Sequence, residues 1–230
     1  MEAIILVGGL GKRLRSVVSE LPKPMAPIDN KPFLHYIFWY LNKQGIDQVI
    51  LSTGYKHEMI ETYFGNRYHG ISINYSIEQE PLGTGGAIKK AFRKTTEENV
   101  VIINGDTLFL VDLRKMFERH ISFKADLTLA LKPMKEFERY GTVITRDSRV
   151  IAFKEKGYHS EGNINGGVYI ANKAIFECES LSEKFSFEQD FLEKEFQQKK
   201  FYGFISDAYF IDIGIPDDYR KAQKELQHYI

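Results

Sequence analysis

The chain has 230 residues, of which 43% are hydrophobic and 27% charged, the composition of one soluble domain with a full core. Its 31 basic and 31 acidic residues cancel, so no broad basic surface for nucleic acid or anionic lipid is expected. A single cysteine excludes an internal disulfide, and no apolar run forms a signal peptide or reaches the about 18 residues of a membrane span, so we expect a cytoplasmic protein.

Strands and helices alternate through the first half of the chain. Short apolar runs predict strands at 3–7, 48–53, 72–77 and 100–104. Amphipathic patterns predict helices at 33–44, 57–64, 85–94 and 113–120. This spacing favours right-handed crossover units, in which each helix links two parallel strands of one sheet.

The second half is richer in strands with short connections. Strands are predicted at 126–132, 141–145, 150–154 and 167–171, followed by helices at 173–179 and 187–199. Strands at 202–205 and 209–211 precede a last helix at 216–228, which opens with Pro216, Asp217 and Asp218, as helix N-termini prefer. Residues 1–230 are therefore predicted to form one α/β domain with a Rossmann-like, mixed, mainly parallel sheet flanked by helices.

The strand at 3–7 runs directly into a glycine-rich loop. Gly8, Gly9 and Gly11 let backbone N–H groups approach an anion closely, and Lys12 and Arg13 add positive charge. The dinucleotide fingerprint would need a further glycine at position 14, which is leucine, and the Walker A sequence is absent too. The loop therefore suits a polyphosphate but matches neither of these motifs.

A lysine between two prolines follows the loop. Because a residue before proline prefers extended backbone and Pro22 fixes its own φ, we expect Lys23 to be held in a preset, extended segment. The loop G-G-x-G-x-R-L together with P-K-P resembles the signature of the sugar-1-phosphate nucleotidyltransferases, the enzymes that make nucleotide sugars. For the tripeptide alone, a solvated lysine in a proline turn would be the more ordinary interpretation.

The resemblance implies a reaction in which a sugar 1-phosphate oxygen attacks the α-phosphorus of a nucleoside triphosphate and pyrophosphate leaves. A phosphate monoester is already an anion near neutral pH, so no general base is expected. The implied catalytic residues are Arg13, which steadies the leaving pyrophosphate, Lys23, which contacts the phosphates, and Asp106. The implied nucleotide-binding residues are Leu6, Gly8, Gly9, Gly11, Lys12, Arg13, Lys23, Glu78, Glu80, Gly83, Thr84 and Asp106.

Two aspartates are candidate ligands of Mg²⁺. Asp106 follows the apolar run 100–103, which places it beyond the carboxyl end of a strand, where open α/β sheets bind ligands. Mg²⁺ takes one or two carboxylates plus substrate phosphate oxygens, and Asp212, flanked by apolar residues, resembles the second metal ligand of the family. The alternatives are a simple Asn-Gly-Asp turn and a local structural carboxylate.

Segment 78–86 resembles the base-recognition loop of the family, especially of its guanylyltransferases. Guanine presents N–H donors, and Glu78 and Glu80 are candidate acceptors for them. Gly83 would permit the backbone to approach the base closely. The alternative is an exposed acidic turn in which Thr84 caps a helix.

Segments 140–141, 154–157 and 164–169 resemble the sugar-phosphate half of the family's site, which implies an arrangement of residues 1–120 for the nucleotide and 121–230 for the sugar phosphate. Gly157 stands where many relatives have proline, and a surface charge cluster is the alternative interpretation. The implied sugar-phosphate residues are Gly141, Glu155, Lys156, Asn165 and Gly166.

Segments 22–28, 186–192 and 211–216 resemble most the branch of guanylyltransferases that act on D-glycero-α-D-manno-heptose 1-phosphate. The implied partners are GTP and this sugar 1-phosphate, giving GDP-heptose for bacterial surface polysaccharides. Mannose-1-phosphate guanylyltransferases are the nearest alternative, and uridylyltransferases come next. A glycosyltransferase would normally carry Asp-x-Asp after the central strands, and an inactive sensor would not be expected to keep all four of Arg13, Lys23, Asp106 and Asp212. The 13% aromatic content suits a homodimer interface or a well-filled core equally.

Overall fold

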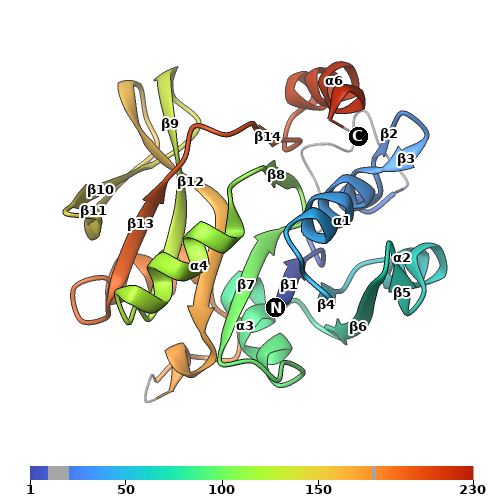
Figure 1. The fold of residues 1–230 in the computed structure, drawn as a ribbon, viewed down its shortest axis with the longest axis horizontal. Helices are drawn as coiled ribbons and strands as arrows, with labels where there is room; N and C mark the ends of the chain where they lie inside the picture. Colours follow the sequence, from blue (N-terminus) through green and yellow to red (C-terminus); the bar gives the residue numbers. More distant parts are fainter. Residues whose placement is uncertain (10–20, 178–179, 230) are drawn as a thin grey trace.

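The computed structural model describes residues 1–9, 21–177 and 180–229. These residues form a ten-stranded sheet in the order β10-β11-β13-β9-β12-β7-β1-β4-β6-β5, with helices on both faces (Figure 1). Its strands are β1 (Glu2–Leu6), β4 (Gln48–Thr53), β5 (Arg67–Tyr68), β6 (Ile71–Ile77), β7 (Asn99–Asn104), β9 (Leu127–Phe137), β10 (Thr142–Arg146), β11 (Arg149–Lys154), β12 (His159–Asn172) and β13 (Phe201–Ile205). The helices are α1 (Phe33–Lys43), α2 (His57–Phe64), α3 (Gly83–Phe92), α4 (Leu113–Ser122), α5 (Glu193–Glu195) and α6 (Pro216–Glu225).

The first half of the chain forms the parallel part of the sheet, as predicted. Strand β1 pairs in parallel with β4 on one side and with β7 on the other, and β4 pairs in parallel with β6. The connecting helices α1, α2 and α3 lie close to their predicted positions. All four strands therefore end at the same edge of the sheet, which is where ligands bind in such folds.

The second half is largely antiparallel, so the predicted mixed sheet is confirmed, whereas its mainly parallel character holds for the first half only. Strand β12 lies between β7 and β9 and is antiparallel to both, and β10 and β11 form an antiparallel pair. Strand β13 is parallel to β9. The sheet is therefore mixed, because short connections in the second half reverse the chain without a crossover helix.

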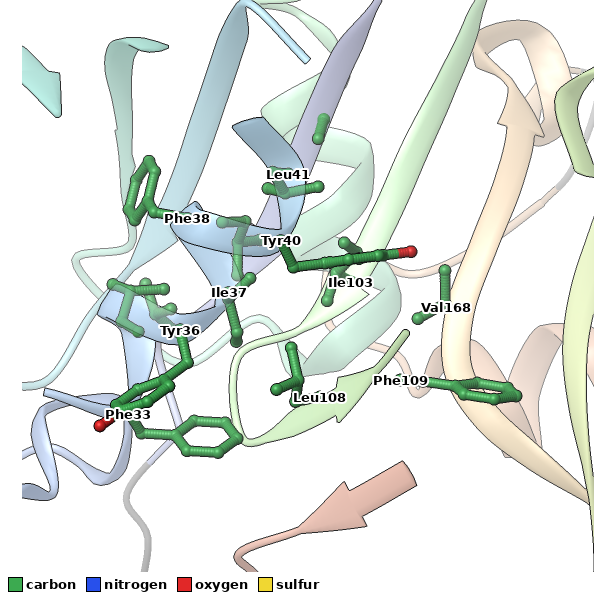
Figure 2. Packing of buried hydrophobic residues seen from close by; sticks show 14 of the residues in the cluster. Phe33, Tyr36, Ile37, Phe38, Tyr40, Leu41, Ile103, Leu108, Phe109 and Val168 are labelled. Carbon is green, nitrogen blue, oxygen red and sulfur yellow. The ribbon is translucent and has the colours of Figure 1, made fainter. Parts of the chain in front are cut away.

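The two faces of the sheet are covered by separate apolar clusters. Along β1, Ala3, Ile5 and Val7 pack into one cluster, while Ile4 packs into the other, because neighbouring side chains of a strand point to opposite faces. Figure 2 shows the first cluster, in which side chains of α1 pack with Ile103 of β7 and with residues that come after β7 in the chain.

Two predicted helices in the second half are wrong in extent or type. At 173–179 the structure has a 3₁₀ helix limited to Lys173–Phe176, and Cys178 lies outside the described residues. At 187–199 a π-helix, Phe187–Leu192, precedes the short α5. Among the described residues, no helix combines the length and apolar character needed to cross a bilayer.

Candidate active site

A cavity of about 970 Å³ lies at the edge where β1, β4, β6 and β7 end. Residues that follow each of these strands contribute to its wall, as expected for an open α/β sheet. Eight of the predicted nucleotide-binding residues line the cavity: Leu6, Gly8, Gly9, Lys23, Glu78, Gly83, Thr84 and Asp106. Gly11, Lys12 and Arg13 lie outside the described residues, so their predicted contacts stay predictions.

The first two glycines of the loop both line the cavity but have different surroundings. A Cβ atom on Gly8 would lie 2.8 Å from Oε1 of Glu78 and at an ordinary contact distance of 3.4 Å from the backbone of Gly54. A Cβ atom on Gly9 would meet nothing within 4 Å among the described residues. A side chain at position 8 would therefore displace the carboxylate of Glu78, whereas the strands themselves leave room for it.

Lys23 lines the cavity. Its backbone is helical and not extended as predicted. It opens a short 3₁₀ helix, Lys23–Met25, in which the N–H of Met25 donates to the carbonyl of Pro22 at 2.8 Å. The side chain is 11% exposed, and its Nζ is 2.5 Å from Oδ2 of Asp106 and 3.9 Å from Oδ1 of Asp212. The lysine is therefore not a solvated surface residue.

Backbone pairing brings the two aspartates together although they are distant in sequence. Asp106 follows β7, and Asp212 ends β14 (Phe210–Asp212), which pairs antiparallel with β8 (Thr107–Phe109) so that Asp212 faces Thr107. The N–H of Ile213 donates to the carbonyl of Asp106 at 3.0 Å. Because these residues pair through the backbone, the two carboxylates and Lys23 converge on one point.

The environment of Asp212 places two negative charges close together. Burial and the nearby Asp106 carboxylate raise the pKa of Asp212, while Lys23 and the N–H of Gly214, which donates to Oδ1 at 2.7 Å, act in the opposite direction. Two neighbouring carboxylates that repel each other are stabilised by a cation bound to both.

A second cavity, of about 280 Å³, lies against the other side of Asp212. Its wall includes Arg139, Tyr140 and Asp218. Tyr140 belongs to the segment 140–141 predicted for the sugar phosphate, whereas Arg139 and Asp218 were not predicted as site residues. Arg139 donates to Oδ2 of Asp218 at 2.5 Å and lies 3.7 Å from Oδ2 of Asp212. The hydroxyl of Tyr140 donates to the same oxygen of Asp212 at 3.3 Å. A sequence signal for Arg139 existed, since it directly precedes the Tyr-Gly pair assigned to the sugar-phosphate half.

The segment predicted to read the base is shaped mainly by its own packing. The N–H of Leu82 donates to Oε2 of Glu78 at 3.0 Å, and burial raises the pKa of this carboxylate. Glu80 is exposed and does not line the cavity. Gly83 has φ +72°, and a Cβ atom there would lie 2.5 Å from the carbonyl oxygen of Phe185, so the close backbone approach is to Phe185.

Thr84 does not cap helix α3, so that alternative is wrong. The helix begins at Gly83 and has no side-chain cap. The hydroxyl of Thr84 instead donates to Oε2 of Glu188 at 2.9 Å and accepts from the N–H of Phe187 at 2.8 Å. Thr84 thereby joins the cavity wall to the π-helix.

The residues predicted for the sugar phosphate line neither of the two cavities. Gly141 is packed tightly, since a Cβ atom there would lie 2.4 Å from the carbonyl oxygen of Lys154, and Glu155 and Lys156 follow as exposed residues. Asn165 donates to the hydroxyl of Tyr169 at 2.8 Å. Gly166 makes room for a neighbouring ring, because its Cβ atom would lie 2.4 Å from the side chain of Phe109. For Asn165 and Gly166, packing within the sheet accounts for the observed contacts.

The arrangement as a whole suits transfer between two phosphorylated molecules. Lys23 and Asp106 line the large cavity, and Asp212 lies within 3.9 Å of the same ammonium, so one cation and two carboxylates surround the point where phosphates would be held. Among the described residues, no group of three His, Cys, Asp or Glu side chains is placed to hold a metal ion. Two carboxylates are what Mg²⁺ takes when substrate phosphates complete its coordination.

Comparison with known proteins agrees with this geometry. The family model described as Nucleotidyl transferase matches residues 2–228. Over 220 residues, covering 95% of this chain and 97% of the relative, the chain is 51% identical to D-glycero-alpha-D-manno-heptose 1-phosphate guanylyltransferase of Campylobacter jejuni subsp. jejuni serotype O:2.

More distant similarity extends to a solved structure and to longer proteins. HddC from Yersinia pseudotuberculosis complexed with GMP-PN superposes with a TM-score of 0.88 at 41% identity, covering 98% of this chain and 99% of that one. Mannose-1-phosphate guanylyltransferase of Mycobacterium tuberculosis is 33% identical over 98% of this chain, which spans 64% of that protein. The predicted family is therefore confirmed: the chain belongs to the nucleotidyl transferase family.

Proposed function

We propose that this chain is a guanylyltransferase that joins GTP and D-glycero-α-D-manno-heptose 1-phosphate, giving GDP-heptose and pyrophosphate. The Campylobacter relative with this activity in its name is 51% identical over nearly the full length of both chains. The observation that carries the proposal is the cluster of Lys23, Asp106 and Asp212 beside a cavity large enough for a nucleotide.

The reaction requires alignment and charge neutralisation rather than a base. An oxygen of the sugar 1-phosphate forms a bond to the α-phosphorus of GTP, and the bond from that phosphorus to the bridging oxygen of pyrophosphate breaks. The attacking oxygen belongs to a phosphate that is already ionised near neutral pH, so no proton has to be removed. Lys23 is well placed to neutralise charge on the phosphates, because it lines the larger cavity next to both carboxylates.

Mg²⁺ fits the carboxylates that the chain supplies. Asp106 and Asp212 would hold the ion, which supplies further neutralisation of the phosphate oxygens when bound. Burial, and to a smaller extent the Asp106 carboxylate, raises the pKa of Asp212, and a dication bound to both groups would stabilise their ionised forms.

The remaining roles follow the positions of the residues in the two halves of the chain. We assign Leu6, Gly8, Gly9, Gly11 and Lys12 to the nucleotide and Arg13 to the leaving pyrophosphate. Glu78 is the stronger candidate for the base, since it lines the cavity and Glu80 does not. For the sugar phosphate we retain Gly141, Glu155, Lys156, Asn165 and Gly166 as proposals. GTP is a cytoplasmic metabolite, and we propose that the reaction takes place there, in the supply of surface polysaccharide precursors.

The proposal is tested by measuring pyrophosphate release from each of GTP, ATP, UTP and dTTP with heptose, mannose and glucose 1-phosphates. We expect Mg²⁺-dependent turnover that is fastest with GTP and the heptose phosphate. Turnover restricted to UTP or dTTP would overturn the guanine assignment. Faster turnover with mannose 1-phosphate would instead favour the mannose branch, to which the chain is 33% identical.

A further inference from the structure

Asp212, the proposed second ligand of Mg²⁺, stands at the end of a chain of hydrogen bonds, whose interpretation rests on the proposed function. Nη1 of Arg139 donates to Oδ2 of Asp218 at 2.5 Å, and Nη2 of the same guanidinium donates to the hydroxyl of Tyr140 at 3.2 Å. That hydroxyl donates in turn to Oδ2 of Asp212 at 3.3 Å. The chain therefore connects α6, the segment between β9 and β10, and β14.

The direction of each hydrogen bond in this chain is determined by the groups themselves. A guanidinium has donors only, so the oxygen of Tyr140 has to accept from Arg139. An ionised carboxylate accepts only, so the single proton of the phenol has to point at Asp212. Each member of the chain therefore fixes the orientation of the next one.

Both oxygens of the Asp212 carboxylate are held. Oδ2 accepts from Tyr140, and Oδ1 accepts from the N–H of Gly214 at 2.7 Å, so the carboxylate cannot rotate about its Cβ–Cγ bond without breaking one of these contacts. Oδ1 is also the oxygen that lies 3.9 Å from Nζ of Lys23, which lines the larger cavity. Because a carboxylate oxygen has two lone pairs, Oδ1 keeps one for a ligand on the side of Lys23.

Neither charge nor stability accounts for an arginine beside Asp212. Nη2 of Arg139 lies 3.7 Å from Oδ2 of Asp212, where its positive charge repels a second cation. The side chains of Arg139 and Asp218 are 34% and 28% exposed, and partly exposed ion pairs contribute little to stability. An orienting role, in contrast, uses the geometry of all the contacts.

Outer hydrogen-bond partners of metal ligands have a known effect on metal binding. They orient the ligand, and their loss typically costs roughly 10- to 100-fold in metal affinity or activity. We propose that Arg139 and Tyr140 are positioning residues, which hold the carboxylate of Asp212 in the orientation that binds Mg²⁺, and that Asp218 anchors Arg139 for this purpose.

The experiment measures metal binding directly, with Mn²⁺ as the probe. Free Mn²⁺ is followed by electron paramagnetic resonance in the presence of a GTP analogue that has a methylene group between the α- and β-phosphates, so no turnover is needed. We expect Tyr140→Phe and Arg139→Gln each to weaken Mn²⁺ binding roughly 10- to 100-fold. Tyr140→Phe changes no charge, and Arg139→Gln removes a positive charge, which by electrostatics alone would strengthen the binding of a cation.

Two matched control variants carry the same chemical changes elsewhere. The hydroxyl of Tyr209 donates to Oε2 of Glu225 at 2.8 Å, so Tyr209→Phe removes another tyrosine-to-carboxylate hydrogen bond. Arg220 pairs with Asp217 on the surface of α6, so Arg220→Gln removes another paired arginine. None of these four residues lines either cavity, and we expect both controls to bind Mn²⁺ like the unchanged protein.

The outcomes separate this proposal from the proposed function. Unchanged Mn²⁺ binding in Tyr140→Phe, or tighter binding in Arg139→Gln, would overturn the positioning role. A raised KM for the sugar 1-phosphate with unchanged Mn²⁺ binding would also overturn it, because Tyr140 would then act on the substrate. Should Arg139→Gln fail to fold by circular dichroism, Tyr140→Phe, which keeps the ring, decides the question. If Asp212→Asn itself binds Mn²⁺ normally, the metal site of the proposed function is wrong and the positioning role falls with it.

Discussion

Replacement of Asp106 by alanine separates a catalytic carboxylate from a structural one. The carboxylate lines the larger cavity and contacts the ammonium of Lys23 at 2.5 Å. If it holds Mg²⁺ against the phosphates, its removal takes away one preorganised electrostatic contact to the transition state. Such contacts are worth roughly 100- to 1,000-fold in kcat, or about 2.7–4 kcal/mol of activation free energy.

The same change is expected to affect folding little. The Asp106 side chain is 36% exposed, and ion pairs of this kind contribute about 0–1 kcal/mol. Lys23 is not left without a partner, because Asp212 lies 3.9 Å away, and the repulsion between the two carboxylates disappears. We therefore expect the free energy of unfolding of Asp106→Ala to stay within about 1 kcal/mol of the unchanged protein.

Asp112→Ala is a control that should lower stability and leave turnover unchanged. The carboxylate of Asp112 accepts from the N–H of Lys115 at 3.1 Å and caps helix α4, away from both cavities. Loss of an N-cap costs about 0.5–2 kcal/mol of stability, and kcat should not change. The assays are pyrophosphate release under saturating GTP and sugar phosphate, and urea unfolding followed by circular dichroism. If Asp106→Ala unfolds the protein, or folds normally and keeps its turnover, the catalytic interpretation of this residue is refuted.

Two further predictions concern stability. Burial lowers the pKa of His120 from 6.5 to about 4 in the folded protein. Between pH 6.5 and pH 4 the imidazole is therefore protonated in the unfolded chain but neutral in the folded protein. Stability should therefore fall as pH drops below 6.5, by about 2 kcal/mol at pH 5 relative to pH 7.5, and urea unfolding of His120→Gln should lack this component. A Cβ atom on Gly85 would lie 2.1 Å from the ring of Phe185, which is buried, so Gly85→Ala should cost about 1–3 kcal/mol. A melting temperature equal to that of the unchanged protein would contradict this packing argument.

Local sequence determined the features of this protein that depend on near neighbours. The apolar run before Gly8 and Gly9 predicted a buried strand that ends at the glycines, because a short apolar run bounded by glycine involves only neighbouring positions. The alternating pattern of the first half likewise predicted its parallel strands and crossover helices. The family signature then named Lys23, Asp106 and Asp212 as partners, and the structure brings the three together.

Tertiary structure decided what depends on segments that are far apart in the chain. No local pattern places β12 antiparallel between β7 and β9, since either direction buries the same apolar face. The pairing of β14 with β8 sets the distance between the two aspartates, and the contact of Arg139 with Asp218 creates a charged wall in a cavity that short-range patterns do not describe. These features arise from backbone pairing and packing between segments that are distant in the chain, and Arg139 and Asp218 are 79 positions apart. The sequence constrains which groups are available, and the fold determines which of them meet.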